Sequence, residues 1–448
     1  MAADFEHPAS ADGRLGELLR LSGPAILSRL GIMTMGLIDA IVVGQYSSTE
    51  LAYHGLGWAP TSVVLTTVIG LLAGVQVMAA RYVGEGRAGD TGMVLRRALG
   101  YAAALGVVST LLCYFGGPAF IRATGVEPAL AEGAGRAMQV FALSLLPYLL
   151  FCALTFWLEG LGRPTPGMVA MWIANLVNLG LALWLVPGHV AGIDGAVGAA
   201  WATFGARVAV LVLLAVWLWR WPGSREHGAF APGDDGRGSE QRRIGYGAGA
   251  SYFAESMAFA GMSFVAGRLA TLDVAAWAIV INLAAIVFMG PLGISTATSV
   301  LVGRAFGGRD RADVVRSGWL GFGTVTALTA LVSVVVWVGD DLIARAYTRD
   351  PALIALVAPA LALSCLFFVA DGLQVVAANA LRARGDIVVP TITHVISYVV
   401  IMLPLGWVLA HNAGLGLDGI VGAVIVASLV SAGFLMARFL LLARRPLG

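Results

Sequence analysis

Three carboxylates lie well inside long apolar runs of this 448-residue chain: Asp39, Glu255 and Asp371. The run around Asp39, residues 24–43, is long enough to cross a bilayer. A charge at the middle of a membrane span costs about 2.5–3.5 kcal/mol on insertion scales. Because of this cost, acids at such depth commonly serve ion paths, proton relays or ligand binding. The three acids are therefore the first candidates for a functional site.

Side chains that carry oxygen accompany these acids. Ser251 and Tyr252 precede Glu255 by about one helical turn, and Gln374 follows Asp371 by one turn. The other polar candidates within apolar runs are Asn175, Asn178, Thr203 and Asn282. Carbonyl, hydroxyl and carboxylate oxygens are the ligands that a hard cation needs once it sheds water. Either such a cation or a proton would neutralise the buried charge, so the pattern predicts sites that load and unload a small cation.

The composition assigns these residues to a membrane protein. The chain is 58% hydrophobic and only 12% charged, whereas a soluble domain has about 25% charged residues. A spanning helix needs about 20 mostly apolar residues. The sequence therefore predicts an all-α polytopic membrane protein with twelve spans, at residues 23–44, 53–80, 97–116, 134–158, 165–187, 195–220, 246–268, 274–302, 318–339, 352–380, 388–409 and 418–443.

The placement of arginine predicts the orientation of the chain. All 28 basic residues are arginine, and 21 of them lie in the tails and in the loops after even-numbered spans. Only five lie in the loops after odd-numbered spans. By the positive-inside rule both termini are cytoplasmic, and a bacterial-type inner membrane is the expected location. The net charge of +2 gives no reason to expect a nucleic-acid partner.

The chain consists of two similar halves. Sliding the first half forward by 223 residues places ARYVGEGRAGD (80–90) on GRAFGGRDRAD (303–313) and Gly70 on Gly293. Six spans per half make these parallel repeats, which can rock about a central cavity. The polar, glycine-rich stretch between the halves predicts a flexible linker. The predicted domains are a tail at 1–22, an N-lobe at 23–221, a linker at 222–244, a C-lobe at 245–443 and a tail at 444–448.

The repeat tests whether the three acids serve only packing. An acid that the scaffold requires should have an acidic equivalent in the other half. The equivalent positions are Met262 for Asp39, Ile32 for Glu255 and Tyr148 for Asp371. None is acidic, which favours function over packing for all three.

Other polar residues favour simpler roles. Arg81, Arg304, Asp90 and Asp313 lie at cytoplasmic helix ends, where capping and topology explain them. Glu159 lies near the same surface, which predicts an ion pair or a solvated charge. Pro24 lies within the first span and could act as a hinge.

These residues resemble the multidrug and toxic compound extrusion (MATE) transporters over nearly the whole chain. IDAIVVGQYSSTELA (38–52) is similar to the family's first-helix signature, and FMGPLGISTATSVLVGRAFG (288–307) to the segment that ends its eighth helix. DGLQVVAANALRARGD (371–386) resembles the tenth helix of the NorM-type branch. These segments occur in the family's order and spacing.

The resemblance implies an antiporter with two six-helix lobes in a V-shaped arrangement. It would expel organic, often cationic, drugs in exchange for Na⁺ or H⁺, as a monomer and without a cofactor. The family's cation sites carry over to Glu255 and Asp371 in the C-lobe, including a possible Na⁺ site, and to Asp39, Asn178 and Thr203 in the N-lobe.

Two residues depart from the family pattern. Asn175 and Asn178 are three residues apart where the family usually has four, which makes Asn175 the weaker candidate. Phe367 stands where NorM-type sequences commonly carry tyrosine, and the missing hydroxyl favours H⁺ over Na⁺.

The sequence leaves three alternatives to an antiporter. A flippase for lipid-linked saccharides, on a related helical plan, would favour a strongly basic cavity, whereas only Arg29 and Arg207 lie well inside spans, away from their ends. A membrane-embedded enzyme would need clustered catalytic residues, and no HExxH or GxSxG motif is present. A channel would have no use for acids divided between two halves.

Overall fold

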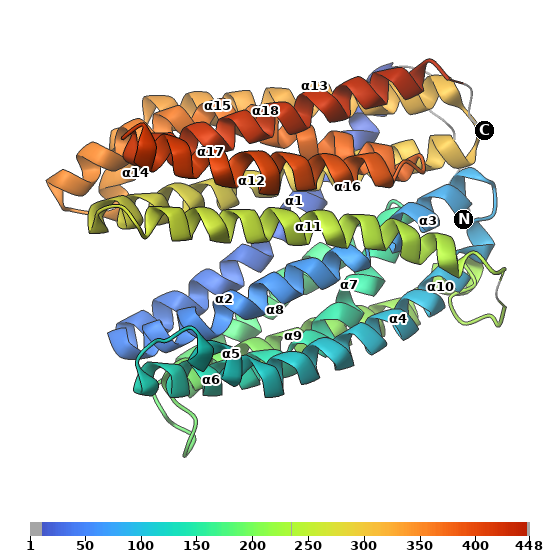
Figure 1. Cartoon of the computed structure of the whole chain (residues 1–448). Helices are drawn as coiled ribbons and strands as arrows, with labels where there is room; N and C mark the ends of the chain where they lie inside the picture. Colours follow the sequence, from blue (N-terminus) through green and yellow to red (C-terminus); the bar gives the residue numbers. More distant parts are fainter. Residues whose placement is uncertain (1–10, 234, 446–448) are drawn as a thin grey trace. The chain divides into compact units, whose positions relative to one another are not determined.

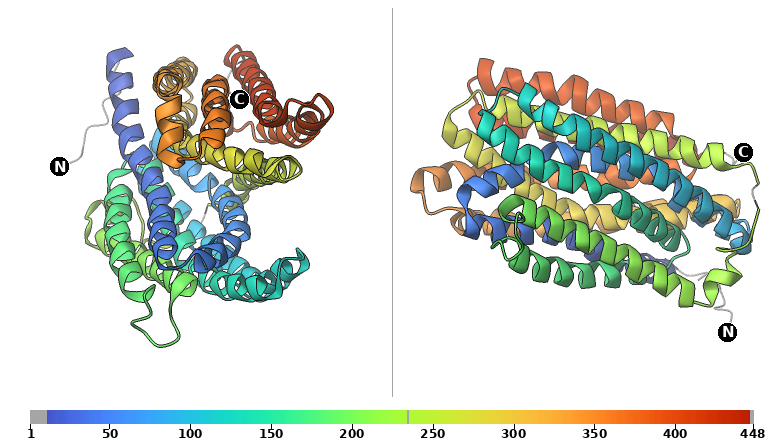
Figure 2. Two further views of the ribbon diagram at one scale, coloured as in Figure 1. Left: turned by 90° about the vertical axis from the view of Figure 1, so that its left-hand side faces the viewer. Right: turned by 90° about the horizontal axis from the view of Figure 1, so that it is seen from below.

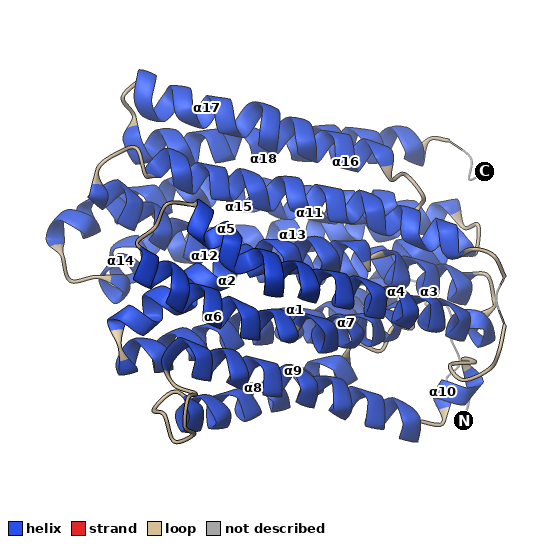
Figure 3. Ribbon diagram, turned by 60° about the horizontal axis from the view of Figure 1, so that its bottom comes forward, coloured by secondary structure: helices blue, strands red, loops and turns tan. Residues whose placement is uncertain are grey.

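The computed structural model describes residues 11–233 and 235–445. Across these residues the regular structure is helical, as Figure 3 shows, apart from an isolated bridge between Val190 and Ile193. The ends of the predicted tails, residues 1–10 and 446–448, and linker residue 234 lie outside the described residues.

The chain forms two compact units. Unit 2 contains Ser28–Met257, and within it α8 packs on α9, α4 on α7 and α2 on α6. Its helices are the second part of α1 (Ala11–Tyr46), α2 (Ser48–Leu71), α3 (Gly74–Gly84), η1 (Ala88–Asp90), α4 (Thr91–Leu111), η2 (Leu112–Gly116), α5 (Gly117–Ala123), α6 (Pro128–Leu143), α7 (Leu145–Gly160), α8 (Thr165–Leu185), α9 (Gly195–Arg220), α10 (Gly223–Glu226) and most of α11 (Gly238–Ala266).

Unit 1 contains Met1–Leu27 and Ala258–Gly448. Its long helices α12, α13, α15 and α18 run alongside one another (Figures 1 and 2). Besides the first part of α1 and the end of α11, its helices are α12 (Thr271–Gly307), α13 (Arg311–Val338), α14 (Asp340–Tyr347), α15 (Pro351–Ala383), α16 (Val388–His394), η3 (Val395–Met402), α17 (Leu403–Trp407), η4 (Val408–Asn412) and α18 (Gly416–Ala443).

The twelve predicted spans all coincide with helices. Several spans are built from consecutive pieces, as where α6 ends and α7 begins at Ser144. Among the described residues, eleven helices are long and apolar enough to cross a membrane. The remaining predicted span is α11, which has 29 residues and is made less apolar by polar side chains such as Glu255.

The helix boundaries confirm the internal repeat. Four pairs of helices begin 223 residues apart: α2 and α12, α5 and α14, α6 and α15, and α8 and α16. The short helices α5 and α14 were not predicted from hydropathy, because each has fewer than ten residues.

The linker is docked on unit 2, so the prediction of a flexible segment was wrong. The Gly92 amide donates to the His227 carbonyl at 2.8 Å, and Arg96 Nη1 donates to the Gly228 carbonyl at 2.8 Å. Gly228 has a φ of +66°, which suits glycine, and a Cβ at Gly92 would collide with the Gly228 backbone. The glycines therefore permit close packing here instead of flexibility.

An acidic residue fastens the end of the linker. Asp235 accepts a hydrogen bond from Tyr82 and forms an ion pair with Arg97 at 2.6 Å. Burial works to raise the pKa of Asp235, but the hydrogen bonds from Tyr82, Arg237 and Arg97, together with the Arg97 charge, outweigh it and lower the pKa to about 2. Asp235 is therefore a charged anchor at neutral pH.

The unit boundaries fall inside two continuous helices. They lie at 27/28 in α1 and at 257/258 in α11, whereas the predicted lobes begin at residues 23 and 245. The first part of α1 groups with the second half of the chain because ion pairs join the two segments. One of them is the 2.6 Å contact between Arg14 and Asp313. Pro24 lies inside α1, three residues before the boundary, and its role as a hinge stays a prediction.

Candidate functional site

Asp39 is the centre of a buried polar cluster in unit 2. Asn178 Nδ2 of α8 donates to Asp39 Oδ1 at 3.0 Å, and Thr203 Oγ1 of α9 donates to Asp39 Oδ2. All three side chains are buried, with Asp39 only 2% exposed. The structure therefore brings together the three residues that the sequence analysis assigns to the N-lobe site.

Arg207 lies one turn beyond Thr203 on α9 and was not predicted as part of this site. Its Nη1 donates to Ser144 Oγ at 2.8 Å, and its guanidinium lies 4.5 Å from the centroid of the Tyr148 ring. Arg207 attracts Asp39 electrostatically. Within the described residues, however, the two side chains are more than 4 Å apart and form no ion pair. Asp39 thus has a positive neighbour that does not neutralise it by direct contact.

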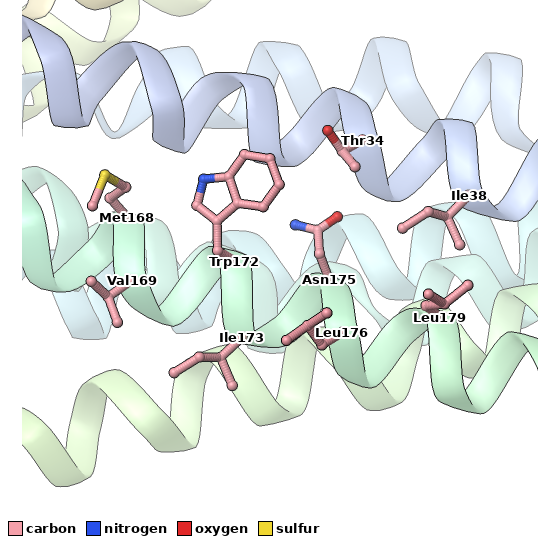
Figure 4. Close-up of a pocket in the computed structure, with 9 residues that line it drawn as sticks. All are labelled: Thr34, Ile38, Met168, Val169, Trp172, Ile173, Asn175, Leu176 and Leu179. Carbon is pink, nitrogen blue, oxygen red and sulfur yellow. The ribbon is translucent and has the colours of Figure 1, made fainter.

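Asn175 does not join the Asp39 cluster. Its Nδ2 donates to the carbonyls of Gly31 and Met171, at 3.0 and 2.9 Å, so it ties α8 to α1. Figure 4 shows Asn175 and Trp172 pointing from α8 toward α1. The weaker standing that the sequence analysis gave to Asn175 agrees with this backbone role.

A pocket of about 540 Å³ lies beside Asn175. Its lining is almost entirely apolar: Thr34, Ile38, Met168, Val169, Trp172, Ile173, Asn175, Leu176 and Leu179. Asp39 does not line it, and Leu176 is 70% exposed on the surface of the unit. The pocket is therefore separate from the Asp39 cluster.

Asp371 forms a second buried cluster, in unit 1. Gln374 Nε2 and the Tyr398 hydroxyl both donate to Asp371 Oδ1, each at 3.2 Å. Asp371 is 9% exposed, and Gln374 and Tyr398 are fully buried. Within the described chain, Oδ2 accepts no hydrogen bond, so that oxygen remains available to a cation or proton.

Tyr398 changes the expectation drawn from Phe367. Phe367, one turn before Asp371, is a buried apolar residue and offers no hydroxyl to the carboxylate. Tyr398 supplies a hydroxyl to the same carboxylate from the π-helical segment η3. It lies 27 residues from Asp371 within an apolar run, so no local spacing could have indicated it.

Glu255 lies on α11 and is partly exposed. Of its predicted neighbours, Ser251 Oγ donates to the Gly247 carbonyl at 3.0 Å, and the Tyr252 ring lies against Gly70. Glu255 belongs to unit 2 and Asp371 to unit 1. A Na⁺ site formed by both acids therefore stays a prediction.

Asn282 takes part in a contact between two helices of unit 1. Its Oδ1 accepts a hydrogen bond from the Tyr347 hydroxyl at 2.8 Å, which joins α12 to α14. Across residues 11–233 and 235–445, no group of three or more His, Cys, Asp or Glu side chains could hold a metal ion. A bound Na⁺ would therefore depend on amide and hydroxyl oxygens beside no more than two carboxylates.

Glu159 provides a contrast with Asp39 and Asp371. Both of its carboxylate oxygens lie 3.4 Å from Arg29 Nη2, and the Glu159 side chain is 1% exposed. This confirms the prediction of an ion pair, although Arg29 was not named as its partner. The pair ties α7 to α1 and gives Glu159 a counter-charge in direct contact.

Comparison with known families adds independent information. The MatE family model matches the chain twice, over residues 24–184 and 248–408. The two matches cover the two halves that the repeat defines.

Curated relatives match almost the full length. A probable multidrug resistance protein NorM from Caulobacter vibrioides is 53% identical over 429 residues, which cover 95% of this chain and 91% of the relative. Another protein of that name, from Deinococcus radiodurans, is 32% identical over 448 residues and 96% of each chain.

Solved structures support the fold. A structure described as the outward-facing conformation of a multidrug resistance MATE family transporter matches with a TM-score of 0.88. The match covers 96% of this chain and 97% of the other at 20% identity. At that identity the likeness concerns the fold alone.

Proposed function

The chain belongs to the MATE family, and from this premise we propose that it is a multidrug efflux transporter driven by cation antiport. It exports organic, often cationic, compounds in exchange for H⁺ or Na⁺ across a bacterial inner membrane. Both termini are cytoplasmic, the functional form is a monomer, and the two lobes alternate access by rocking.

The observation that carries this proposal is the contrast between the buried acids. Glu159 is neutralised by Arg29. Asp39 and Asp371 are instead held by neutral donors and form no ion pair within the described residues. A buried carboxylate without a fixed counter-charge is costly unless a cation or proton visits it. Asp39 and Asp371 are therefore suited to repeated loading and release.

The same geometry supports exchange with a cationic drug. A cation at either carboxylate removes the charge that a cationic substrate would otherwise favour. Each ligand then disfavours the bound state of the other, and this coupling is reciprocal. Loading from outside would release the drug, and loss of the cation inside would restore the empty carboxylates.

Dye efflux from vesicles tests the proposal. We expect efflux to respond to an imposed H⁺ or Na⁺ gradient, and Asp371→Asn and Glu255→Gln to lose that response. Expression and membrane insertion of each variant serve as controls. Wild-type efflux by both variants at normal expression would contradict the proposal.

Tyr398→Phe is expected to identify the coupling ion. Losing one hydrogen bond to a charged group is worth about 1.5–3 kcal/mol, or a shift of roughly tenfold or more in the half-saturating ion concentration. For H⁺ this concentration should fall, because the carboxylate gives up one bond fewer on protonation. For Na⁺ it should rise, because a hydroxyl oxygen is lost as a ligand. Efflux titrated against each ion gives the sign, and no shift with either ion would remove Tyr398 from the site.

A further inference from the structure

The two halves of the chain begin with the same charged pattern. Arg14 and Glu17 lie three residues apart in the first turns of α1, and the same spacing separates Arg237, the residue before α11, from Glu240 in its first turn. The two patterns are 223 residues apart, the period of the repeat. They were not recognised from the sequence because both lie outside the apolar spans.

The glutamates of this pattern pair across the repeat. Glu17, from the first half, forms an ion pair with Arg304 of the second half at 3.0 Å. Glu240, from the second half, forms an ion pair with Arg81 of the first half at 2.7 Å. Arg81 and Arg304 are themselves equivalent positions. The two pairs are thus the same contact made twice, with the roles of the halves exchanged.

The arginines of the pattern also pair with acids, but the two acids are not at equivalent positions. Arg14 pairs with Asp313 at 2.6 Å, and Arg237 pairs with Glu85 at 2.9 Å. The position equivalent to Asp313 is Asp90, five residues from Glu85. Each arginine therefore contacts an acid that lies shortly after α3 or shortly after the equivalent stretch of the second half.

Glycines repeat the exchange deeper in each unit. A Cβ on Gly293 would lie 2.7 Å from the Ile26 backbone nitrogen, and a Cβ on Gly70 would lie 2.7 Å from the Gly249 Cα atom. Gly70 and Gly293 are equivalent, as are Ile26 and Gly249. Real Cβ atoms do not approach so closely. Each glycine therefore allows the first helix of the other half to pack closely against it.

We infer that the two halves exchange the cytoplasmic segments of their first helices, and that each half holds the segment it receives on a docking surface of fixed design. The surface consists of a glycine and an arginine: Gly293 with Arg304 for α1, and Gly70 with Arg81 for α11. The segment bound on this surface is the start of the other half's first helix, whose glutamate forms an ion pair with the arginine. α1 is thereby anchored to unit 1 while it carries Asp39 within unit 2.

The two anchors differ in strength. Glu17 and Arg304 are 15% and 10% exposed, whereas Glu240 is 44% exposed. An exposed pair contributes little, while breaking a buried pair leaves an uncompensated charge. The Glu17–Arg304 pair is therefore the stronger anchor.

A cross-linking trap tests the exchange directly. The background is the full chain with its three cysteines replaced and a protease site inserted at Pro232, in the linker. After treatment with a short bismaleimide cross-linker, which spans cysteines whose Cα atoms lie too far apart for a direct disulfide, Glu17→Cys with Arg304→Cys is expected to hold the two cleaved fragments together on a denaturing gel. Arg81→Cys with Glu240→Cys is expected to do the same.

The control pairs Glu17→Cys with Arg345→Cys. Arg345 lies beyond α13, whose 28 residues span about 40 Å at 1.5 Å per residue, and this pair should not cross-link. If the Glu17 and Arg304 cysteines leave the fragments separate, or link them no more than the control, the exchange is overturned.

Charge reversal tests whether the anchor matters for transport, and this part rests on the proposed function. Glu17→Arg alone is expected to lower dye efflux by roughly tenfold or more, and adding Arg304→Glu to restore most of it. Adding Arg81→Glu instead should restore nothing, because that charge faces α11. Equal rescue by both partners would overturn the assignment.

The two tests separate the inference from the proposed function. The cross-linking trap needs no transport, so it can succeed even if Asp371→Asn leaves efflux unchanged. A failed trap beside normal cation dependence would contradict the exchange alone.

Discussion

Replacing Asp39 with asparagine is expected to lower cation-driven efflux by about 100-fold or more. The change keeps the size of the side chain and removes its charge. Two hydrogen bonds to a charged group, each worth about 1.5–3 kcal/mol, become bonds to a neutral amide, and the attraction for a cation is lost. Thr203 and Asn178 donate to Asp39 in the native cluster. Dye efflux at a fixed ion gradient measures the loss.

Asp341→Asn is the matched control for this prediction. It is the same chemical change at an exposed acid, where Asp341 pairs with Arg345 on the surface of α14 and is 58% exposed. Efflux by this variant should equal that of the wild type. If Asp39→Asn also retained full gradient-dependent efflux, the unit 2 cluster would have no part in coupling.

Glu159→Gln is expected to destabilise the protein by about 3–5 kcal/mol, because it leaves Arg29 buried without a counter-charge. The Arg29 side chain is 11% exposed and its guanidinium lies 5.4 Å from the centroid of the Phe156 ring. Thermal unfolding of purified protein in detergent measures the change.

A double variant separates charge from packing at this pair. Glu159→Leu with Arg29→Leu removes both charges, and apolar replacement of a buried ion pair is often neutral or stabilising. We expect its stability to be close to that of the wild type. Equal destabilisation by the single and the double change would show that Glu159 acts through shape and not through charge.

The sequence predicted the membrane helices and the N-lobe cluster because their signals are local or shared with a family. Apolar runs predict spans without knowledge of their partners. The repeat exposed Asp39 and Asp371 as acids without equivalents, and the resemblance supplied Asn178 and Thr203. Hydrogen bonds to Asp39 from two other helices then agreed with that assignment.

The remaining contacts depend on which helices pack together, which no spacing in one chain reveals. Tyr398 and Asp371 are on different helices, as are Arg29 and Glu159. The flexibility of the linker was wrongly predicted for a related reason. Glycine permits flexibility, but it equally permits close backbone approach, and only the presence of a neighbouring segment decides between them.

The paired anchors at Arg304 and Arg81 have a consequence for the origin of the chain. In these contacts a residue of the first half binds a residue of the second half, and the two equivalent residues bind each other in the same way. This reciprocal pattern is that of an isologous dimer. A polypeptide that carried this half only once could bury the start of its first helix by assembling with an identical molecule. Duplication and fusion would then have preserved the paired glutamate–arginine contacts while turning a partnership of two subunits into a single covalent chain.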